Sequence, residues 1–493
     1  MYTLRGIIIC REKFIKIEAR QNMSGVFNNF NDDTICAVAT AMSDSGIGVI
    51  RVSGRDAVSI CDKIYRSAKM EQTLKKHDPN TIKYGYICDG EKIIDEVMVS
   101  FMKAPHSFTR EDVVEINTHG GILIMNQIIE LLLKNGCRLA DPGEFTKRAF
   151  LNGRIDLTKA EAIMDIISAQ NNFALDSSRN QLRGSIYDKV KSMRERIIYE
   201  MAFIESALDD PENYDLTGYP EKLNAKVLDL TNEIEKLLST ADEGKIRKDG
   251  IKTVIVGKPN AGKSSLLNTL IGDERAIVTD IAGTTRDIIE ETVRLGDIVL
   301  HLIDTAGIRD TDDIIEKMGV DKAKSKIEEA DLVLYILDST RDIDDEDEEI
   351  INLCKGKKTI VLLNKNDLSD DIKINEDNVC KFFTNVDNVP VIKTSMLKGN
   401  GIDELKDALS KLFFNGDILP KQEIYITNLR HKELLQKVYD SLKLVEDSIS
   451  KNLSEDFYTV DLSNAYAYLG EIIGEEVGDD LVEEIFSKFC MGK

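Results

Sequence analysis

The feature that most constrains the fold of this chain is a phosphate-binding motif near its middle. Residues 257–264 have the sequence Gly-Lys-Pro-Asn-Ala-Gly-Lys-Ser, which fits the pattern GxxxxGK[ST]. The motif follows a β-type run, Thr253–Val256, and precedes a helical run, Ser265–Leu270, which is the context that it requires. Backbone N–H groups of such a loop, and the start of the following helix, bind phosphate oxygens. We therefore predict an α/β domain in which Lys263 contacts the β- and γ-phosphates and Ser264 binds Mg²⁺.

Two further motifs follow in the order that a guanine-nucleotide hydrolase needs. Residues 304–307, Asp-Thr-Ala-Gly, come at the end of the predicted strand Ile298–Ile303, where Asp304 would hold the Mg²⁺ shell. Residues 364–367, Asn-Lys-Asn-Asp, fit NKxD. A carboxylate at Asp367 accepts from both N1–H and the exocyclic amine of guanine. Adenine would leave that carboxylate unpaired, at a cost of roughly 1–3 kcal/mol, so the sequence predicts a GTPase.

Residues 395–397 complete the predicted guanine site, because a backbone N–H after the last strand would meet guanine O6. The predicted GTP contacts are Asn260, Ala261, Gly262, Lys263, Ser264, Ser265, Thr279, Asp280, Ile281, Ala282, Gly283, Thr284, Thr285, Asp304, Thr305, Ala306, Gly307, Asn364, Lys365, Asp367, Ser395, Met396 and Leu397.

The means of hydrolysis differs from that of Ras. A Ras-type GTPase places a water-orienting Gln directly after the DxxG glycine, and here that position is Ile308. Asn260 offers an amide oxygen to a monovalent cation, whose charge would replace an arginine finger; the alternative is that Asn260 only rigidifies the loop. Thr285 would complete the Mg²⁺ shell. Arg286 is a second candidate finger, with a surface ion pair as its alternative.

The pattern of apolar residues divides the chain into domains. Residues 34–152 mix β-type runs with one helical stretch and predict an α+β domain, whereas residues 250–416 alternate strands and helices and predict a mostly parallel sheet. Residues 153–249 and 417–493 carry the apolar stripes of amphipathic helices. Neither helical block suffices for a bundle, so we predict one all-α domain, split in sequence, with the α/β domain inserted. We expect residues 1–33 to be an extension that is partly disordered.

Individual elements follow from the same patterns. The expected strands are Thr34–Thr40, Gly48–Val52, Glu96–Phe101, Val113–Asn117, Thr253–Val256, Ile298–Ile303, Leu332–Leu337, Thr359–Leu363 and Pro390–Ile392, and Ile122–Lys134 is an expected helix. We expect the acidic run Arg341–Glu349 to be a solvated loop.

Composition excludes several classes of protein. The net charge of −23 argues against a protein that coats nucleic acid by bulk charge, though not against a local basic groove. No apolar stretch approaches the roughly 20 residues of a membrane span. The eight cysteines never form CxxC, so metal-finger spacing is absent and reduced thiols in the cytoplasm are expected. The apolar run 6–10 is too short for a secretory segment, and Met23 is an alternative start.

Three stretches resemble the MnmE/TrmE family of tRNA-modification GTPases. The G-motif region 257–309 looks like the TrmE subgroup, although Era- and Der-type GTPases share part of it. Residues 141–157, Asp-Pro-Gly-Glu-Phe-Thr-Lys-Arg-Ala-Phe-Leu-Asn-Gly-Arg-Ile-Asp-Leu, resemble the family signature RPGEF-x-x-RAFLN-x-[KR]-x-DL. The chain ends Phe-Cys-Met-Gly-Lys, similar to the family's FC-[IL]-GK, with Met491 in place of the usual Ile, Leu or Val. The resemblance covers residues 34–493.

The resemblance implies a GTP hydrolase that works with an FAD-dependent MnmG partner on tRNA. Together they install aminomethyl or carboxymethylaminomethyl groups at C5 of wobble uridine. The one-carbon unit would come from 5,10-methylene- or 5-formyl-tetrahydrofolate, bound by the N-terminal domain through which the chain forms a homodimer. The two proteins would form a heterotetramer, and the G domains would associate on binding K⁺ and GTP.

The resemblance also implies roles for single residues. Arg51, Glu115, Arg154 and Lys493 would contact the folate; Asn260, Thr279, Ile281 and Thr284 would surround K⁺; and Glu316 would orient the attacking water. A nucleophilic role of Cys490 toward uracil C6 is a separate hypothesis. The residues themselves also allow structural roles. Arg51 would form a salt bridge on an edge strand, Glu115 would face solvent, and Arg154 would cap or pair. Glu316 would lie on a solvated helix face, and Cys490 would be a small buried residue.

Two other functions remain open from the sequence. An Era/Der-like ribosome-assembly GTPase without group transfer predicts a basic RNA-binding module after the G domain, and the acidic helical residues 417–493 count against it. A membrane-linked GTPase would use its helices as an anchor, but acidic residues flank the apolar stripes.

Overall fold

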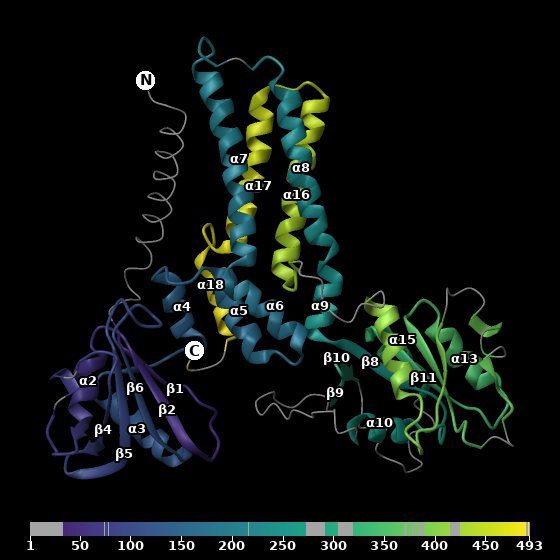
Figure 1. The fold of residues 1–493 in the computed structure, drawn as a ribbon, viewed down its shortest axis with the longest axis horizontal. Coiled ribbons are helices and arrows are strands. Elements are labelled where there is room, and N and C mark those ends of the chain that lie inside the picture. The colour runs from purple at the N-terminus through teal and green to yellow at the C-terminus, as the bar shows by residue number, and fades with distance from the viewer. Residues whose placement is uncertain are drawn as a thin grey trace. The chain divides into compact units, whose positions relative to one another are not determined.

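The structure is a computed structural model, and it describes most of the chain in two units (Figure 1). The described residues are 33–72, 74–76, 78–214, 216–272, 291–303, 319–368, 372–376, 379, 381–383, 389–414, 424–489 and 492. One unit comprises residues 1–168, 178–236 and 433–493, and the other comprises residues 169–177 and 237–432. The predicted extension 1–33 lies outside the described residues, apart from Asp33.

The first unit begins with an α+β domain around a seven-stranded sheet of order β3-β4-β5-β6-β2-β1-β7. The strands are β1 (Ile35–Val38), β2 (Ser45–Ser53), β3 (Tyr65–Ser67), β4 (Ile82–Asp89), β5 (Lys92–Met102), β6 (Val113–Gly120) and β7 (Arg138–Leu139). Helices α2 (Ala57–Ile64) and α3 (Ile122–Lys134) pack their apolar sides on one face of this sheet in a single core. On the other face Ile82, Tyr84 and Met98 are exposed.

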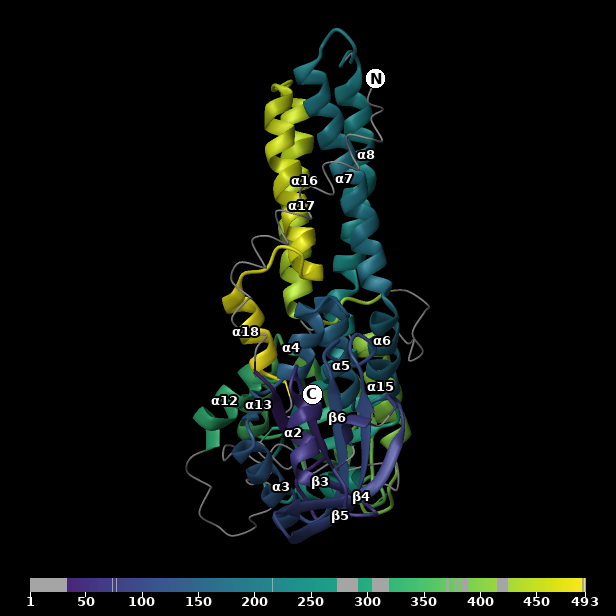
Figure 2. The same cartoon turned by 90° about the vertical axis from the view of Figure 1, so that its left-hand side faces the viewer.

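The same unit contains the helical domain. Its helices come from both of the sequence segments predicted for it, one before and one after the inserted domain (Figures 1 and 2). They are α7 (Ser185–Asp209), α8 (Tyr219–Ser239), α16 (Leu429–Ser450) and α17 (Glu455–Ile473). α7 ends immediately before Asp210-Pro211, because proline cannot continue a helix. The shorter helices α4 (Glu144–Leu151), α5 (Leu157–Ser168) and α18 (Asp479–Ser487) also belong to this unit, and α6 (Asn172–Arg183) has residues in both units. The split helical domain is therefore confirmed, whereas its sequence boundaries stay predictions.

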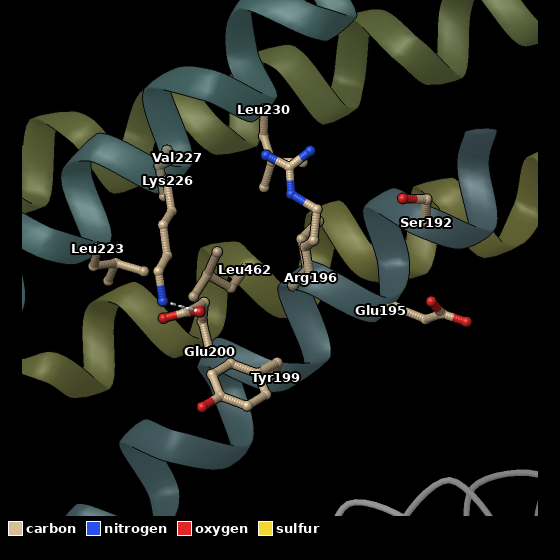
Figure 3. A pocket seen from close by; sticks show the side chains of 11 residues that line it. Ser192, Glu195, Arg196, Tyr199, Glu200, Leu223, Lys226, Val227, Leu230 and Leu462 are labelled. Carbon is tan, nitrogen blue, oxygen red and sulfur yellow. Dashed lines mark hydrogen bonds and ion pairs between the residues drawn. The ribbon is translucent and has the colours of Figure 1, made fainter.

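The helical domain holds a cavity of about 430 Å³ between α7 and α8 (Figure 3). Leu223, Val227, Leu230 and Leu462 give it apolar walls. Every cation at its rim has an acidic partner: Lys226 pairs with Glu200 at 2.6 Å, and Arg196 pairs with Glu233 and Asp229.

The second unit is built on a six-stranded sheet of order β13-β12-β11-β8-β10-β9. The strands are β8 (Ile251–Val256), β9 (Glu291–Leu295), β10 (Ile298–Leu302), β11 (Leu332–Asp338), β12 (Thr359–Asn364) and β13 (Val391–Lys393). All pairs are parallel except β9 with β10. The helices are α9 (Ala241–Asp249), α10 (Lys263–Gly272), α12 (Gly319–Glu329), α13 (Asp345–Cys354) and α15 (Ile402–Phe414). Alternate strand residues bury into two separate cores, as a sheet covered on both faces requires.

The predicted solvated loop at Arg341–Glu349 is wrong. Only its first residues form a loop, and Asp344 begins α13 as the N-cap of a capping box, with its side chain accepting from Glu346 N and Asp347 N. Four acidic residues occupy the first turn, where negative charge stabilises a helix. Charge alone did not distinguish a helix start from a solvated loop.

Among the described residues, no helix is both long and apolar enough to cross a membrane.

Candidate functional site

The phosphate loop lies between β8 and α10, and it holds its lysine in place before any ligand binds. Lys263 Nζ donates to the carbonyl oxygens of Gly257 (2.7 Å) and Lys258 (2.8 Å). Burial, and then repulsion from Arg341, lowers the pKa of Lys263. An ammonium group has three donors, so the third remains for a phosphate oxygen.

Asn364 of the NKxD motif fastens the guanine side of the site to the phosphate loop. Its Nδ2 donates to the Ala261 carbonyl at 2.9 Å, and its Oδ1 accepts from Met396 N at 3.1 Å. Gly262, the residue after Ala261 in the phosphate loop, has φ +109°. A Cβ atom on Gly262 would lie 2.0 Å from Asn364 Nδ2. Only glycine therefore fits at Gly262, and one buried amide joins three motifs that are far apart in sequence.

The carboxylate predicted to bind guanine is already oriented. Asp367 Oδ1 accepts from Ser395 Oγ at 2.8 Å, and this hydrogen bond is the main reason that the pKa of Asp367 lies below its usual value. Lys365 Nζ donates to Asp338 Oδ2 at 2.6 Å, and this bond ties the loop that carries Asp367 to the end of β11. The carboxylate is thus an ionised acceptor, as recognition of guanine requires.

The remaining predicted GTP residues divide into two groups. Asn260 lies in the loop with an exposed side chain, Ala261 is buried, and Ser264 and Ser265 lie in the first turn of α10. Leu397 is 88% exposed beside the buried Ser395 and Met396. The predicted residues that lie outside the described residues are Thr279, Asp280, Ile281, Ala282, Gly283, Thr284, Thr285, Arg286, Asp304, Thr305, Ala306, Gly307 and Glu316.

Lys258 adds a contact that the sequence did not reveal. Its side chain is 5% exposed, and its Nζ pairs with Asp344, with Asp347 at 3.0 Å and with Glu346 at 3.5 Å. Asp347 is buried and also accepts from Tyr335 Oη at 3.0 Å. Although burial opposes its charge, the Asp344 and Asp347 carboxylates raise the pKa of Lys258. The acidic start of α13 therefore anchors the phosphate loop.

A second site forms in the α+β domain, where three of the four predicted folate residues come together. Arg51 Nε donates to Glu115 Oε1 at 2.9 Å, and Arg51 Nη1 donates to the Gly492 carbonyl at 3.0 Å. The Arg51 guanidinium lies 5.9 Å from the Phe108 ring centre, and that of Arg154 lies 4.8 Å from it. Lys493 and Cys490 lie outside the described residues, but Gly492 brings the end of the chain to Arg51.

These contacts bear on the structural alternative for Arg51, which was a salt bridge on an edge strand. The Arg51–Glu115 salt bridge exists, but β2 lies between β6 and β1 and is not an edge strand. Sequence reasoning missed Phe108 and Phe145, whose rings lie under Arg51. Phe145 belongs to the 141–157 signature, and that was the available signal.

Two other residues of that signature, Glu144 and Arg148, belong to a charge network that positions α4. Arg148 is 4% exposed and bonds Asp33 at 2.6 Å, Glu111 at 3.2 Å and Glu144 at 2.9 Å. Glu144 also accepts from Arg138 at 2.6 Å. Because burial raises the cost of an unpaired charge, this network fixes the helix that carries Phe145.

The parallel sheet, the phosphate loop and the oriented Asp367 together define a P-loop protein that binds guanine nucleotides. Residues 34–154 match the model of the GTP-binding protein TrmE N-terminus, and residues 157–490 match that of the MnmE helical domain. The chain belongs to the MnmE/TrmE family.

Its relatives share almost the whole chain. It is 50% identical over 461 residues to the tRNA modification GTPase MnmE of Lachnoclostridium phytofermentans, covering 94% of this chain and 99% of the relative. It is 47% identical to that of Clostridioides difficile and 45% identical to that of Bacillus licheniformis, each covering 94% of this chain and 100% of the relative. Among solved structures, the G domain of the T. maritima FeoB iron transporter is 26% identical over 33% of this chain and 98% of that chain. Its TM-score of 0.24 is too low to support a fold comparison.

Proposed function

We propose that this chain is a GTP hydrolase that acts in tRNA modification. The carrying observation is Asn364, which joins the phosphate loop to the 395–397 loop beside the oriented Asp367 carboxylate. This geometry supports GTP as the nucleotide. The curated relatives, each called a tRNA modification GTPase and matched over 94% of this chain, support tRNA modification as the purpose.

Two cations fit the donor set of the phosphate loop. The Ser264 hydroxyl at the start of α10 suits Mg²⁺, and the exposed Asn260 amide suits K⁺, because both ions prefer oxygen ligands. We propose Thr285 as a second Mg²⁺ ligand and Thr279, Ile281 and Thr284 as further K⁺ ligands. When bound, these cations would neutralise charge that develops on the phosphates during hydrolysis.

The chain's own residues bind and orient the substrate. Lys263 contacts the β/γ oxygens while Gly257 and Lys258 hold its other donors. Asp367 receives the two guanine donors while Ser395 holds its Oδ1. We further propose that Glu316 orients the attacking water, with Arg286 as a candidate finger.

We also propose that the Arg51–Glu115 cluster binds 5,10-methylene- or 5-formyl-tetrahydrofolate. A pterin offers an amide N–H and an exocyclic amine, the donor pair that a carboxylate such as Glu115 accepts. The Phe108 and Phe145 rings offer flat apolar surface beside it. The folate would supply a one-carbon unit, and Lys493 and Cys490 would join the site from the chain end at Gly492.

The group transfer itself needs redox chemistry that we assign to a partner. We propose an MnmG-type FAD protein, assembled with a homodimer of this chain as a heterotetramer, which modifies C5 of wobble uridine in the cytoplasm. Because this chain carries a net charge of −23, we assign much of the contact with tRNA phosphates to the partner. If the chain alone bound tRNA as tightly as the complex does, that division would be refuted.

The test is nucleoside mass spectrometry of bulk tRNA from cells that lack this gene. Rescue by the intact gene should restore the C5-modified wobble uridine. Rescue by the Lys263→Ala variant should not restore it, because the phosphates lose the ammonium group of Lys263. Lys134→Gln, an exposed change at the end of α3, is the matched control and should rescue fully. Unchanged wobble uridine in the deletion strain would favour the Era/Der-like ribosome-assembly GTPase instead.

A further inference from the structure

A cavity of about 510 Å³ in the first unit includes two arginines among its lining residues. Arg110 and Arg154 line it together with Phe108, Ser107 and His106. Within the part of the chain that the structure describes, no carboxylate is paired with either arginine. The helical cavity differs, because Lys226 is paired with Glu200 (Figure 3) and Arg196 is paired with Asp229 and Glu233.

Neutral carbonyl groups hold both arginines instead. Arg154 Nη1 donates to the Phe108 carbonyl at 2.8 Å, and Arg110 Nη1 donates to the Asn152 carbonyl at 2.8 Å. The acids nearest in sequence are already engaged: Glu111 with Arg148 and Ser53, Asp112 with Ala104 N, and Asp156 with Lys159. Burial and the charge of Arg110 both lower the pKa of Arg154. The cavity therefore presents two positive charges that the protein has not neutralised.

The backbone at Arg110 indicates that its position is imposed. Its φ is +61, in the left-handed region that favours glycine. The neighbouring carbonyl groups fix this turn, since Asn152 Nδ2 donates to Thr109 O at 2.6 Å and Arg154 holds Phe108 O. A long cationic side chain thus occupies a strained position beside another cation, and such strain is concentrated at functional sites.

We propose that Arg110 and Arg154 bind the anionic tail of the folate and select forms that carry several γ-linked glutamates. This rests on the proposed folate function. Phe108 connects the two sites, because the guanidinium groups of both Arg51 and Arg154 lie against its ring. Each added glutamate brings one more carboxylate, and a guanidinium binds carboxylates through two parallel N–H donors. One arginine suffices for a single carboxylate, whereas the pair suits a chain of them.

The experiment measures binding of 5-formyl-tetrahydrofolate with one or three glutamates to the full-length protein by calorimetry. We expect the wild type to bind the triglutamyl form roughly tenfold or more tightly than the monoglutamyl form, with a ratio that falls as salt rises. Arg110→Gly should bring the ratio close to one. Its melting temperature should hold or rise, because glycine relieves the left-handed strain. Arg110→Lys should keep only part of the ratio, and Lys134→Gln should keep all of it.

The outcomes separate this inference from the function beneath it. If the wild type binds neither form, the folate function fails and the inference fails with it. If both forms bind equally well, the folate function stands and the inference alone is overturned. If Arg110→Gly lowers tRNA affinity and leaves the folate ratio unchanged, the cavity serves RNA phosphates and the inference is again overturned.

Discussion

At the residue scale, the choice of nucleotide depends on which atoms of Asp367 are acceptors. Both carboxylate oxygens accept only, so they match the two donors on guanine. Asp367→Asn replaces one acceptor with an NH₂ donor, which opposes the guanine amine and suits a carbonyl at the same ring position. We expect GTP affinity to fall by about 1–3 kcal/mol and affinity for xanthosine triphosphate, which has that carbonyl, to rise. Competition binding with both nucleotides measures the change.

Ser395→Ala is the companion variant, since it removes the hydroxyl that orients Asp367 and keeps the carboxylate. It should weaken both nucleotides without reversing the preference. A reversal with Ser395→Ala, or an unchanged preference with Asp367→Asn, would contradict this account of guanine recognition.

The pair His119–Asp95 predicts a pH effect at one residue. His119 Nδ1 lies 2.6 Å from Asp95 Oδ1, and this hydrogen bond raises the pKa of His119 above its ordinary value of about 6.5. The stabilisation is therefore fully present below pH 6.5 and is lost as pH rises through the higher folded-state pKa. NMR titration should find His119 above the ordinary value, and Asp95→Asn should return it there. If the mutation leaves the titration midpoint where it was, Asp95 is not the cause.

At the element scale, local patterns predicted many of the helices and strands, but they missed β4 (Ile82–Asp89) and did not predict which distant residues pack together. The helix Ile122–Lys134 has the predicted bounds, and the five predicted strands of the second unit all exist. The edge strand Glu291–Leu295 was missed because its polar residues give it no continuous apolar run. The start of α13 was predicted as a solvated loop. Lys258, the cation that pairs with the buried Asp347, lies far away in sequence and gave no local signal.

Separation in sequence between residues that meet in the fold also limits prediction of the two sites. Fixed spacing identified the phosphate loop and NKxD, whereas Arg51 and Glu115 came from a family resemblance. Phe108 and Arg110 carry no motif, and their importance follows from φ, ring contacts and a shared cavity that exist only after folding.

The contact between α13 and the phosphate loop predicts a loss of stability. Lys258→Met keeps the length of the side chain and leaves the buried Asp347 carboxylate without its cation. Breaking a buried pair in this way costs about 3–5 kcal/mol. We expect denaturant unfolding of the nucleotide-binding unit to show that loss, and GDP affinity to fall because Lys263 loses a rigid carbonyl partner. Lys258→Arg should recover most of both.

The matched control for Lys258→Met is Lys393→Met. Lys393 pairs with Glu376 at 3.1 Å, with both side chains about half exposed, and such a surface pair is worth at most about 1 kcal/mol. Equal losses in the two variants would show that burial of the Lys258 pair contributes nothing.

At the scale of the whole molecule, the chain leaves one folding unit and later returns to it. Residues 178–236 and 433–493 belong to the first unit, although the second unit lies between them in sequence. Return of the amphipathic stripes after residue 417 predicted this arrangement. Each unit also has hydrophobic cores of its own, two around the six-stranded sheet and others in the first unit.

Separate cores predict separate responses to ligands. Calorimetry of the full chain should resolve two transitions, because multidomain proteins depart from two-state unfolding. GDP with Mg²⁺ at 100 times its dissociation constant adds about 2.7 kcal/mol to the unit that binds it, which for a unit of this size is a shift of roughly 5–10 °C. Only the transition that contains the phosphate loop should move with GDP, and only the other should move with 5-formyl-tetrahydrofolate. A single transition that both ligands raise would mean that the units unfold together, and the two units would then be coupled by more than the four chain crossings between them.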